Sequence, residues 1–185
     1  MKPIVNLADA PITQGRSGER FEYRMVELAE CLGSKSIGLN VTHVPPGKAA
    51  FPLHHHYANE EHFFILKGTG ILRFGMESYP VKPDDYIFTP PGGPELAHQF
   101  VNTGDEELVY MAISTMALPE VVGYPDSDKT GVRVATEGSE PPRFLISNAS
   151  KSGVNYWDGE DGSAVVAAVT AAHAVLKADE SNLDR

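Results

Sequence analysis

Histidine and glutamate are concentrated in one short segment of the chain, residues 51–68. His54-His-His56, the pair Glu60-Glu61 and His62 fall within nine residues, although the whole chain has only 7 histidines. Imidazole nitrogens and carboxylate oxygens are common protein ligands of transition metals. The density of both groups in this segment predicts a site for a divalent transition-metal ion.

The spacing within this segment indicates which side chains point to the same face of a strand. In a β-strand, residues two apart point to the same face, so His54 and His56 point together and His55 points away. Glu61 lies five residues beyond His56, an odd offset that a continuous strand would place on the wrong face. We therefore expect a turn within residues 57–60, after which a neighbouring strand starts at Glu61 with its carboxylate facing inward.

A further histidine, His98, occurs downstream, after the segment Pro90-Pro-Gly-Gly-Pro94. Strand alternation places Phe100 and Asn102 on the same face as His98. We expect four side chains to converge inside the molecule as metal ligands: His54, His56, Glu61 and His98.

The elements that must hold these side chains are short β-strands separated by turns. Turn-forming clusters such as Lys82-Pro-Asp-Asp85 and Asn102-Thr-Gly-Asp105 punctuate the chain, and helical patterns do not separate them. Short strands at this spacing are typical of an all-β sandwich or barrel. The expected strands are 36–44, 53–57, 61–66, 70–74, 78–81, 86–89, 97–102 and 108–114, with brief strands at 132–135 and 143–146. Residues 21–29 fit a strand or one short helical turn, and the strand is favoured.

The start of the chain is expected to contribute little to this body. Residues 1–20 are mixed and polar and contain prolines and glycines, which predicts an arm with little structure of its own. In residues 36–44, alternation places Ile37, Leu39, Val41 and His43 on one face. We interpret His43 as a hydrogen-bonded wall histidine rather than a ligand.

The end of the chain shows a helical pattern. Asp161-Gly-Ser163 is predicted to cap a helix that continues to about residue 175. Its apolar stripe, Val165, Val169, Ala172 and Leu176, would pack on the β-strands or on a partner subunit. His173 on this helix has no companion ligands and is interpreted as structural, and Trp157 as a residue that packs across a sheet edge.

The histidine-rich segment resembles the first motif of the cupin superfamily. That motif consists of a glycine, a spacer, His-x-His, a glutamate and a second glycine. It corresponds here to a set in the same order: Gly47, His54, His56, Glu61 and Gly68. The spacer between Gly47 and His54 is one residue longer than the family's usual five.

The second cupin motif corresponds to Pro90, Gly92, His98 and Asn102. Asp84 stands where the leading glycine of that motif would be, and five residues rather than two separate Gly92 from His98. The insertion lengthens a loop and leaves His98 available as a ligand. The resemblance covers residues 36–115 and rests on two motifs in the expected order.

The resemblance implies an all-β fold, a cupin jelly-roll β-barrel with an N-terminal arm and a short C-terminal helical extension. The expected parts are an arm and first strands in residues 1–35, the barrel in 36–118, and an extension in 119–185 that packs on the barrel or on a dimer partner. It also implies a homodimer and one divalent ion per subunit, Fe, Mn, Ni, Co or Zn.

Side chains that face inward from the predicted strands would line a cup around the ion. They are Phe63, Ile65, Leu72, Phe74, Phe88, Phe100 and Tyr110. Arg73 would belong to this set only if the register of its strand turned the side chain inward, and the sequence leaves that register open. Glu95, in the enlarged loop, could reach the mouth of the cup, whereas His55 and His62 are expected to face away from the site.

Three classes of function are compatible with such a site. The first is a metal-dependent isomerase or epimerase of a sugar or sugar phosphate, with Glu61 as both ligand and base. A phosphate would require cations, and Lys48, Lys67, Arg73 and Lys82 lie near the motifs. The second is an Fe(II)-dependent dioxygenase or related oxidoreductase, which needs open positions on the ion. The third is a non-catalytic module that binds a small molecule.

Composition and charge limit the partners. The net charge of −10 and a pI near 5.1 argue against nucleic acid and anionic membranes. Neither a span of ~18 apolar residues nor a signal peptide is apparent, and the single cysteine, Cys31, cannot form an internal disulfide, so we expect a cytoplasmic protein. A divalent ion with three neutral imidazoles and one carboxylate keeps a charge of about +1, which predicts an anionic or oxygen-rich small ligand.

Overall fold

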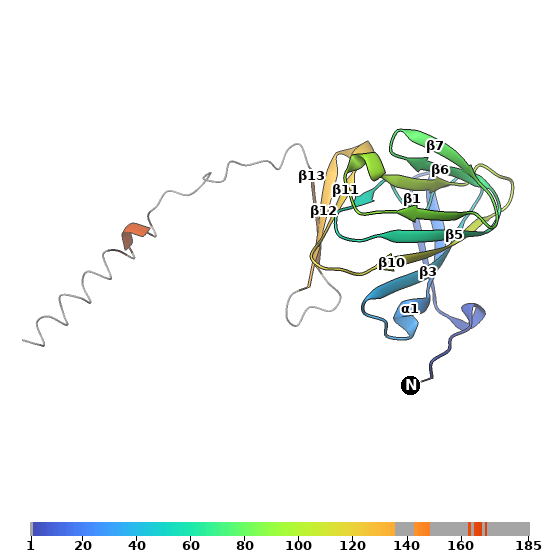
Figure 1. Ribbon diagram of the computed structural model, residues 1–185, viewed down its shortest axis with the longest axis horizontal. Helices are drawn as coiled ribbons and strands as arrows, with labels where there is room; N and C mark the ends of the chain where they lie inside the picture. Colours follow the sequence, from blue (N-terminus) through green and yellow to red (C-terminus); the bar gives the residue numbers. More distant parts are fainter. Residues whose placement is uncertain (1, 136–142, 149–162, 164, 168, 170–185) are drawn as a thin grey trace, which may run out of the picture. The chain divides into compact units, whose positions relative to one another are not determined.

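The computed structural model describes residues 2–135, 143–148, 163, 165–167 and 169. The chain divides into two compact units, Met1–Ser152 and Gly153–Arg185. In the first unit antiparallel β-strands form most of the described structure (Figure 1). An all-β jelly-roll fold, as predicted from the sequence, is therefore confirmed.

The first unit is built from three sheets. The largest has the strand order β1-β2-β3-β10-β5-β8. Its strands are β1 (Ile12–Ser17), β2 (Phe21–Glu27), β3 (Ile37–Val44), β10 (Leu108–Thr115), β5 (Glu61–Lys67) and β8 (Tyr86–Thr89). Only the isolated bridges of Ala49, to Phe21 of β2 and to Val101, link this sheet to a smaller one, so continuous strand pairing does not close the described strands into the barrel that the sequence predicts.

The two smaller sheets carry the remaining strands. One has the order β7-β6-β9, with β7 (Glu77–Val81), β6 (Gly70–Phe74) and β9 (His98–Val101). The other has the order β13-β12-β11-β4, with β13 (Arg143–Asn148), β12 (Lys129–Val134), β11 (Glu120–Tyr124) and β4 (His55–His56). Short helical turns complete the unit: η1 (Leu7–Asp9), α1 (Leu28–Cys31), η2 (Pro94–Leu96) and η3 (Pro125–Ser127).

Two sequence-based expectations for these elements are wrong. Residues 1–20 do not form a structureless arm, because they contain η1 and the edge strand β1, which pairs along its whole length with β2. The strand predicted at 53–57 shortens to the two residues of β4. In addition, β11 was not expected, and it is the strand that pairs with β4.

The register of the large sheet arranges its inward side chains in rows. One row runs Glu27–Asn40–Ala112–Phe63 across β2, β3, β10 and β5. The next runs Met25–Thr42–Tyr110–Ile65. The inward face of β3 is thus the Asn40 and Thr42 face, and Val41 and His43 share the outer face.

Both faces of β3 are covered. Val44 on the inner face is fully buried, and Val41 on the outer face is 3% exposed. Apolar alternation therefore does not distinguish the two sides. His43 is a wall histidine as expected, and its Nδ1 lies 3.4 Å from Glu107 Oε2.

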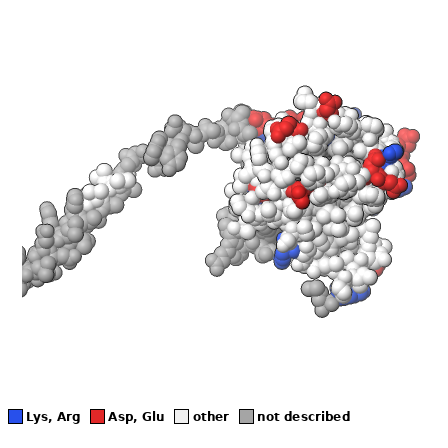
Figure 2. Space-filling model, viewed as in Figure 1, with Lys and Arg blue, Asp and Glu red and all other residues white. Residues whose placement is uncertain are grey.

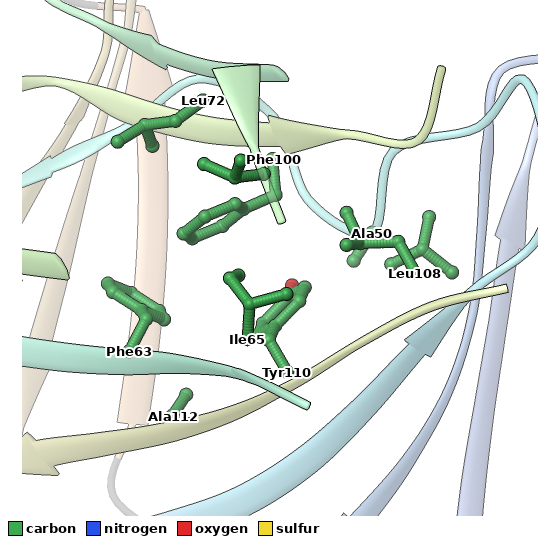
Figure 3. Packing of buried hydrophobic residues seen from close by; sticks show 10 residues of the cluster. Ala50, Phe63, Ile65, Leu72, Phe100, Leu108, Tyr110 and Ala112 are labelled. Carbon is green, nitrogen blue, oxygen red and sulfur yellow. The ribbon is translucent and has the colours of Figure 1, made fainter. Parts of the chain in front are cut away.

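The core lies between the large sheet and the β7-β6-β9 sheet. Ile65 and Leu108 are fully buried. Phe63, Phe100 and Tyr110 turn toward one another (Figure 3). The Phe63 and Phe100 rings meet edge to face with centroids 4.9 Å apart, and those of Phe100 and Tyr110 stack at 4.7 Å. These rings form an apolar floor below the histidine cluster.

Two tight connections fix the strands that carry the cluster. Gly68 follows β5 with φ +75°, and a Cβ at this position would collide with the Glu107 carbonyl. Asp84, at the position of the motif's leading glycine, has φ +74°, and its N–H donates to the Ile65 carbonyl at 3.0 Å. The left-handed backbone is therefore kept although the glycine is not, since aspartate tolerates this region better than most residues.

The described residues of the second unit, 163, 165–167 and 169, are helical, as the capping pattern predicts. Val165, Val166 and Val169 are exposed. The rest of that predicted helix, including His173, and the segment around Trp157 lie outside the described residues. In the part of the chain that the structure describes, every helix is too short or too polar to cross a membrane.

Candidate metal centre

The four predicted ligands come together. Each of His54, His56, Glu61 and His98 offers one ligand atom, and these atoms all lie within 4.8 Å of one another. His54 lies directly before β4, Glu61 begins β5 and His98 begins β9. The odd offset between His56 and Glu61 is resolved by a turn, as the sequence predicts.

The main chain holds two of these residues at a fixed spacing. The His54 N–H donates to the His98 carbonyl at 3.2 Å, and the His98 N–H donates to the His54 carbonyl at 2.8 Å. The two cupin-like motifs are therefore joined through the residues that would bind the ion.

Each of the three imidazoles directs its Nε2 atom toward the Glu61 carboxylate. The Nε2 atoms of His98, His56 and His54 lie 2.8, 3.4 and 4.0 Å from Glu61 Oε2. The Nδ1 atoms of His54 and His98 turn away, to the carbonyl oxygens of Pro52 at 2.9 Å and Leu96 at 3.5 Å. A carbonyl only accepts, so these contacts place a proton on Nδ1 and leave Nε2 free to bind a metal.

His56 shows that the cluster fits a metal ion. Both of its ring nitrogens are buried and have no hydrogen-bond partner among the described residues. A buried polar atom without a partner is costly, and a cation bound by Nε2 removes that cost. Three imidazole nitrogens and one carboxylate form a donor set suited to Zn, Fe, Ni, Co or Mn.

The protonation states in the cluster also suit a metal. Burial, with help from neighbouring His98, lowers the pKa of His54 to about 3, so this imidazole is neutral. Burial opposes ionisation of Glu61, but contacts with His56 and His98 outweigh it and hold the carboxyl pKa below its ordinary value. Burial likewise opposes protonation of His56, but the Glu61 carboxylate outweighs it and raises the His56 pKa. Neutral imidazole and ionised carboxylate are the forms that bind metals, so His54 and Glu61 are ready to bind, whereas an ion must compete with a proton at His56.

A second glutamate, Glu120 of β11, lies behind His56. Its side chain is 3% exposed, and its Oε1 lies 3.8 Å from His56 Nδ1. Oε1 also accepts hydrogen bonds from the Tyr57 N–H at 3.0 Å and the Ala58 N–H at 3.3 Å, and Oε2 accepts one from Asn59 Nδ2. Glu120 thus holds the turn that connects His56 to Glu61.

The other two histidines of the segment lie outside the cluster, as expected. His55 is buried, and its Nδ1 lies 2.8 Å from the Gly92 carbonyl of the enlarged loop. His62 lies on the outer face of the sheet, where it stacks on Phe88 with centroids 4.9 Å apart. Its Nδ1 lies 2.6 Å from the Tyr86 hydroxyl.

The cluster opens onto a cavity of about 260 Å³. Besides the four clustered residues, the lining contains Met25, Glu27, Asn40, Phe51, Phe63, Gln99, Phe100, Tyr110 and Ala112. Of the pocket residues predicted from the sequence, Phe63, Phe100 and Tyr110 line this cavity. Ile65 and Leu72 pack in the core below it instead.

Two predicted pocket residues face other surroundings. Phe88 is 44% exposed on the outer face. Arg73 donates to Asp126 and to Gln99 Oε1, each at 2.7 Å, because its strand register turns it away from Leu72 and Phe74. Neither residue lines the cavity.

Sequence reasoning missed Met25, Glu27, Asn40, Phe51, Gln99 and Ala112. The alternation of Tyr23, Met25 and Glu27 along β2 is the signal that would find the residues of that strand, but the segment is also compatible with a short helical turn.

Among the residues that the structure describes, the cavity lining contains neither lysine nor arginine. The lysines near the motifs bind elsewhere: Lys48 donates to the Glu19 carbonyl, Lys67 pairs with Glu106 at 2.9 Å, and Lys82 pairs with Asp85 at 3.1 Å. On the face shown in Figure 2, basic side chains lie in a few small separate groups. Glu95 accepts a hydrogen bond from the Gly93 N–H and does not line the cavity.

Known proteins share this fold and motif region. Residues 40–114 match the family model Cupin_2, described as a cupin domain. The oxalate-binding protein of Thermotoga maritima is 33% identical over 70 residues, which cover 38% of this chain and 54% of that protein. The matched region thus spans about half the length of the curated relatives.

Solved structures extend the similarity over more of the chain. A candidate sugar phosphate isomerase from Acidithiobacillus ferrooxidans is 26% identical, with a TM-score of 0.63 over 72% of this chain and 81% of that one. A sugar phosphate isomerase of the cupin superfamily from Silicibacter pomeroyi is 22% identical, with a TM-score of 0.69 over 83% of this chain and 98% of that one. Residues 40–114 therefore match a cupin domain, and they carry both histidine motifs within a jelly-roll fold.

Proposed function

We propose that the protein is a metal-dependent isomerase or epimerase of a small hydroxy-carbonyl compound of the sugar class. The observation that carries this proposal is the convergence of three imidazole Nε2 atoms and one carboxylate at the wall of a cavity. The similarity to the candidate sugar phosphate isomerase from Acidithiobacillus ferrooxidans supports it.

His54, His56, His98 and Glu61 would hold the ion. When bound, a divalent ion supplies a Lewis acid that polarises a carbonyl and an adjacent hydroxyl. Because four protein ligands leave open positions on a five- or six-coordinate ion, Fe, Mn, Ni or Co suits this role better than four-coordinate zinc. The aromatic wall of Phe51, Phe63 and Phe100 excludes water from the reacting part of the substrate.

The first experiment identifies the ion. Protein purified without chelator or nickel resin is analysed for metal, together with the variants His98→Ala and His62→Ala. We expect the metal to be lost from His98→Ala and kept by His62→Ala, because only His98 belongs to the cluster. Equal metal content in the two variants would contradict the ligand assignment.

The second experiment tests the reaction. The metal-loaded protein is incubated in D₂O with aldoses, ketoses and their phosphates, and deuterium at carbon is followed by NMR. Incorporation supports the proposal, and its absence from every compound refutes it. Oxygen consumption by the iron-loaded protein would instead indicate a dioxygenase, and ligand binding without turnover a binding module.

A further inference from the structure

The cavity contains a second carboxylate, Glu27, that the proposed metal centre does not use. Glu27 ends β2 and stands in the same row as Asn40, Ala112 and Phe63. The preceding inward residues of β2, Tyr23 and Met25, are an aromatic and an apolar side chain. Glu27 and Glu61 are the two acidic residues of the described lining.

The Glu27 carboxylate lacks partners in the part of the chain that the structure describes. Its side chain makes no capping bond to α1. By contrast, Glu107 is bound by Arg24, and Glu120 accepts three hydrogen bonds. Arg133 lowers the pKa of the Glu27 carboxyl without forming a close ion pair, so this half-buried carboxylate is available to a ligand in the cavity.

The surroundings of Glu27 suit proton transfer. Burial raises the pKa of the Glu27 carboxyl, nearby Glu30 raises it further, and Arg133 partly offsets both. A carboxyl whose pKa is moved toward neutrality is a more effective general base and acid near neutral pH than an ordinary one.

Glu61 is poorly placed for the same task. Its Oε2 faces all three Nε2 atoms, the closest being His98 at 2.8 Å, so its lone pairs are directed at the metal position. Ala112, between Asn40 and Phe63, leaves open space in the row that ends at Glu27. A ligand held at the metal centre can therefore extend along this row toward Glu27.

We propose that Glu27 is the proton-transfer residue of this cavity and acts on an uncharged hydroxy-carbonyl substrate, an inference that rests on the isomerase function proposed above. The Glu27 carboxylate takes the proton from the carbon next to the substrate carbonyl. The C–H electron pair forms the carbon–carbon double bond of an enediolate, and the carbonyl π pair moves to oxygen, which takes up the hydroxyl proton of the neighbouring carbon and leaves the negative charge on that carbon's oxygen. The Glu27 carboxyl then returns its proton to the former carbonyl carbon, while the electron pair of the charged oxygen forms the new carbonyl group.

The absence of cations from the lining indicates the charge of the substrate. A phosphate group would lie against aromatic rings and a carboxylate, with neither lysine nor arginine among the described residues of the lining. Arg133 lies close enough to act on Glu27 and His56, and its charge is offset by that of Glu27. We therefore expect free sugars or hydroxy ketones to react faster than their phosphates.

The test compares Glu27→Gln with Glu22→Gln. Both substitutions remove one carboxylate from β2, but Glu22 is on the outer face and pairs with Arg16 at 3.9 Å. Metal content and thermal unfolding are measured first, and we expect both variants to match the wild type. In metal-loaded protein, deuterium incorporation from D₂O into uncharged substrates should fall by roughly 10²–10⁴-fold in Glu27→Gln and stay unchanged in Glu22→Gln.

Three outcomes would overturn the inference, and they are distinguishable. If wild type and Glu27→Gln exchange at equal rates, the isomerase function stands and the role of Glu27 is refuted. If phosphorylated substrates react faster than uncharged ones, the assignment of the substrate class is refuted. If wild type exchanges no substrate, the proposed function fails and the role of Glu27 with it. Should Glu27→Gln fail to fold, Glu27→Asp provides the same comparison, with a carboxylate shortened by one methylene and an expected partial loss of rate.

Discussion

Glu120 offers the sharpest test of how the metal centre is supported. Truncation by Glu120→Ala removes the acceptor for the Tyr57 and Ala58 N–H groups and for Asn59 Nδ2. Hydrogen bonds to a charged group contribute roughly 1.5–3 kcal/mol each. Two of the three donors keep a second acceptor, because Tyr57 N–H also donates to the Val121 carbonyl and Asn59 Nδ2 to the Ala117 carbonyl.

These remaining contacts reduce the expected loss. Ala58 is exposed, so its N–H can donate to water. We therefore expect Glu120→Ala to lower the free energy of unfolding of the metal-free protein by about 2–3 kcal/mol, less than three full bonds would give. Metal affinity should also fall by roughly 10–100-fold, since Glu120 holds the turn that follows His56 and its Oε1 lies 3.8 Å from His56 Nδ1.

Urea unfolding of metal-free protein and competition with a chromophoric chelator measure the two effects separately. Glu106→Ala is the matched control, because Glu106 is a glutamate on the surface with a side chain 60% exposed, and it should shift stability by less than about 0.5 kcal/mol. The reasoning is refuted if Glu120→Ala unfolds like the control and binds the metal as tightly as the wild type does.

Two further predictions follow from the backbone and the cluster. Gly68→Ala should lower the free energy of unfolding by more than about 3 kcal/mol, because a positive φ is combined with a clash against the Glu107 carbonyl. Gly18→Ala, which has a positive φ in open space, should lower it by about 1 kcal/mol. Equal losses of the two variants in urea unfolding would contradict this account. The second prediction concerns pH: metal affinity should fall by at least about tenfold per pH unit once the pH is below the His56 pKa, which is raised above 6.5. The reason is that the ion must then displace a proton from His56. An affinity that stays constant between pH 7 and 5 would exclude His56 as a ligand.

The metal-site residues could be predicted because the motif spacing encodes strand geometry directly. His54 and His56 share a face, His55 does not, and the odd offset to Glu61 requires the turn that the structure contains. Glu120 could not be predicted in this way, since it reaches His56 through the pairing of β11 with β4, a contact between distant parts of the chain.

The pocket was harder to predict because alternation gives two faces without saying which is inside. On β3 both faces are buried, so alternation did not identify the inward side and Asn40 was missed. Arg73 and Phe88 were assigned to the cavity from strands whose register against their neighbours is set by pairing rather than by local sequence. The edge strand β1 was missed because most of its residues are exposed and polar.

The reciprocal backbone bonds between His54 and His98 bear on how the protein acquires its ion. They close the long loop between the two motifs during folding, so the ion need not supply the entropy of that closure. We therefore expect the metal-free chain to stay folded, unlike small domains that require zinc to fold. An ion can then leave and be replaced without unfolding, and the metal in a given preparation reflects the metals available to the cell as well as their affinities.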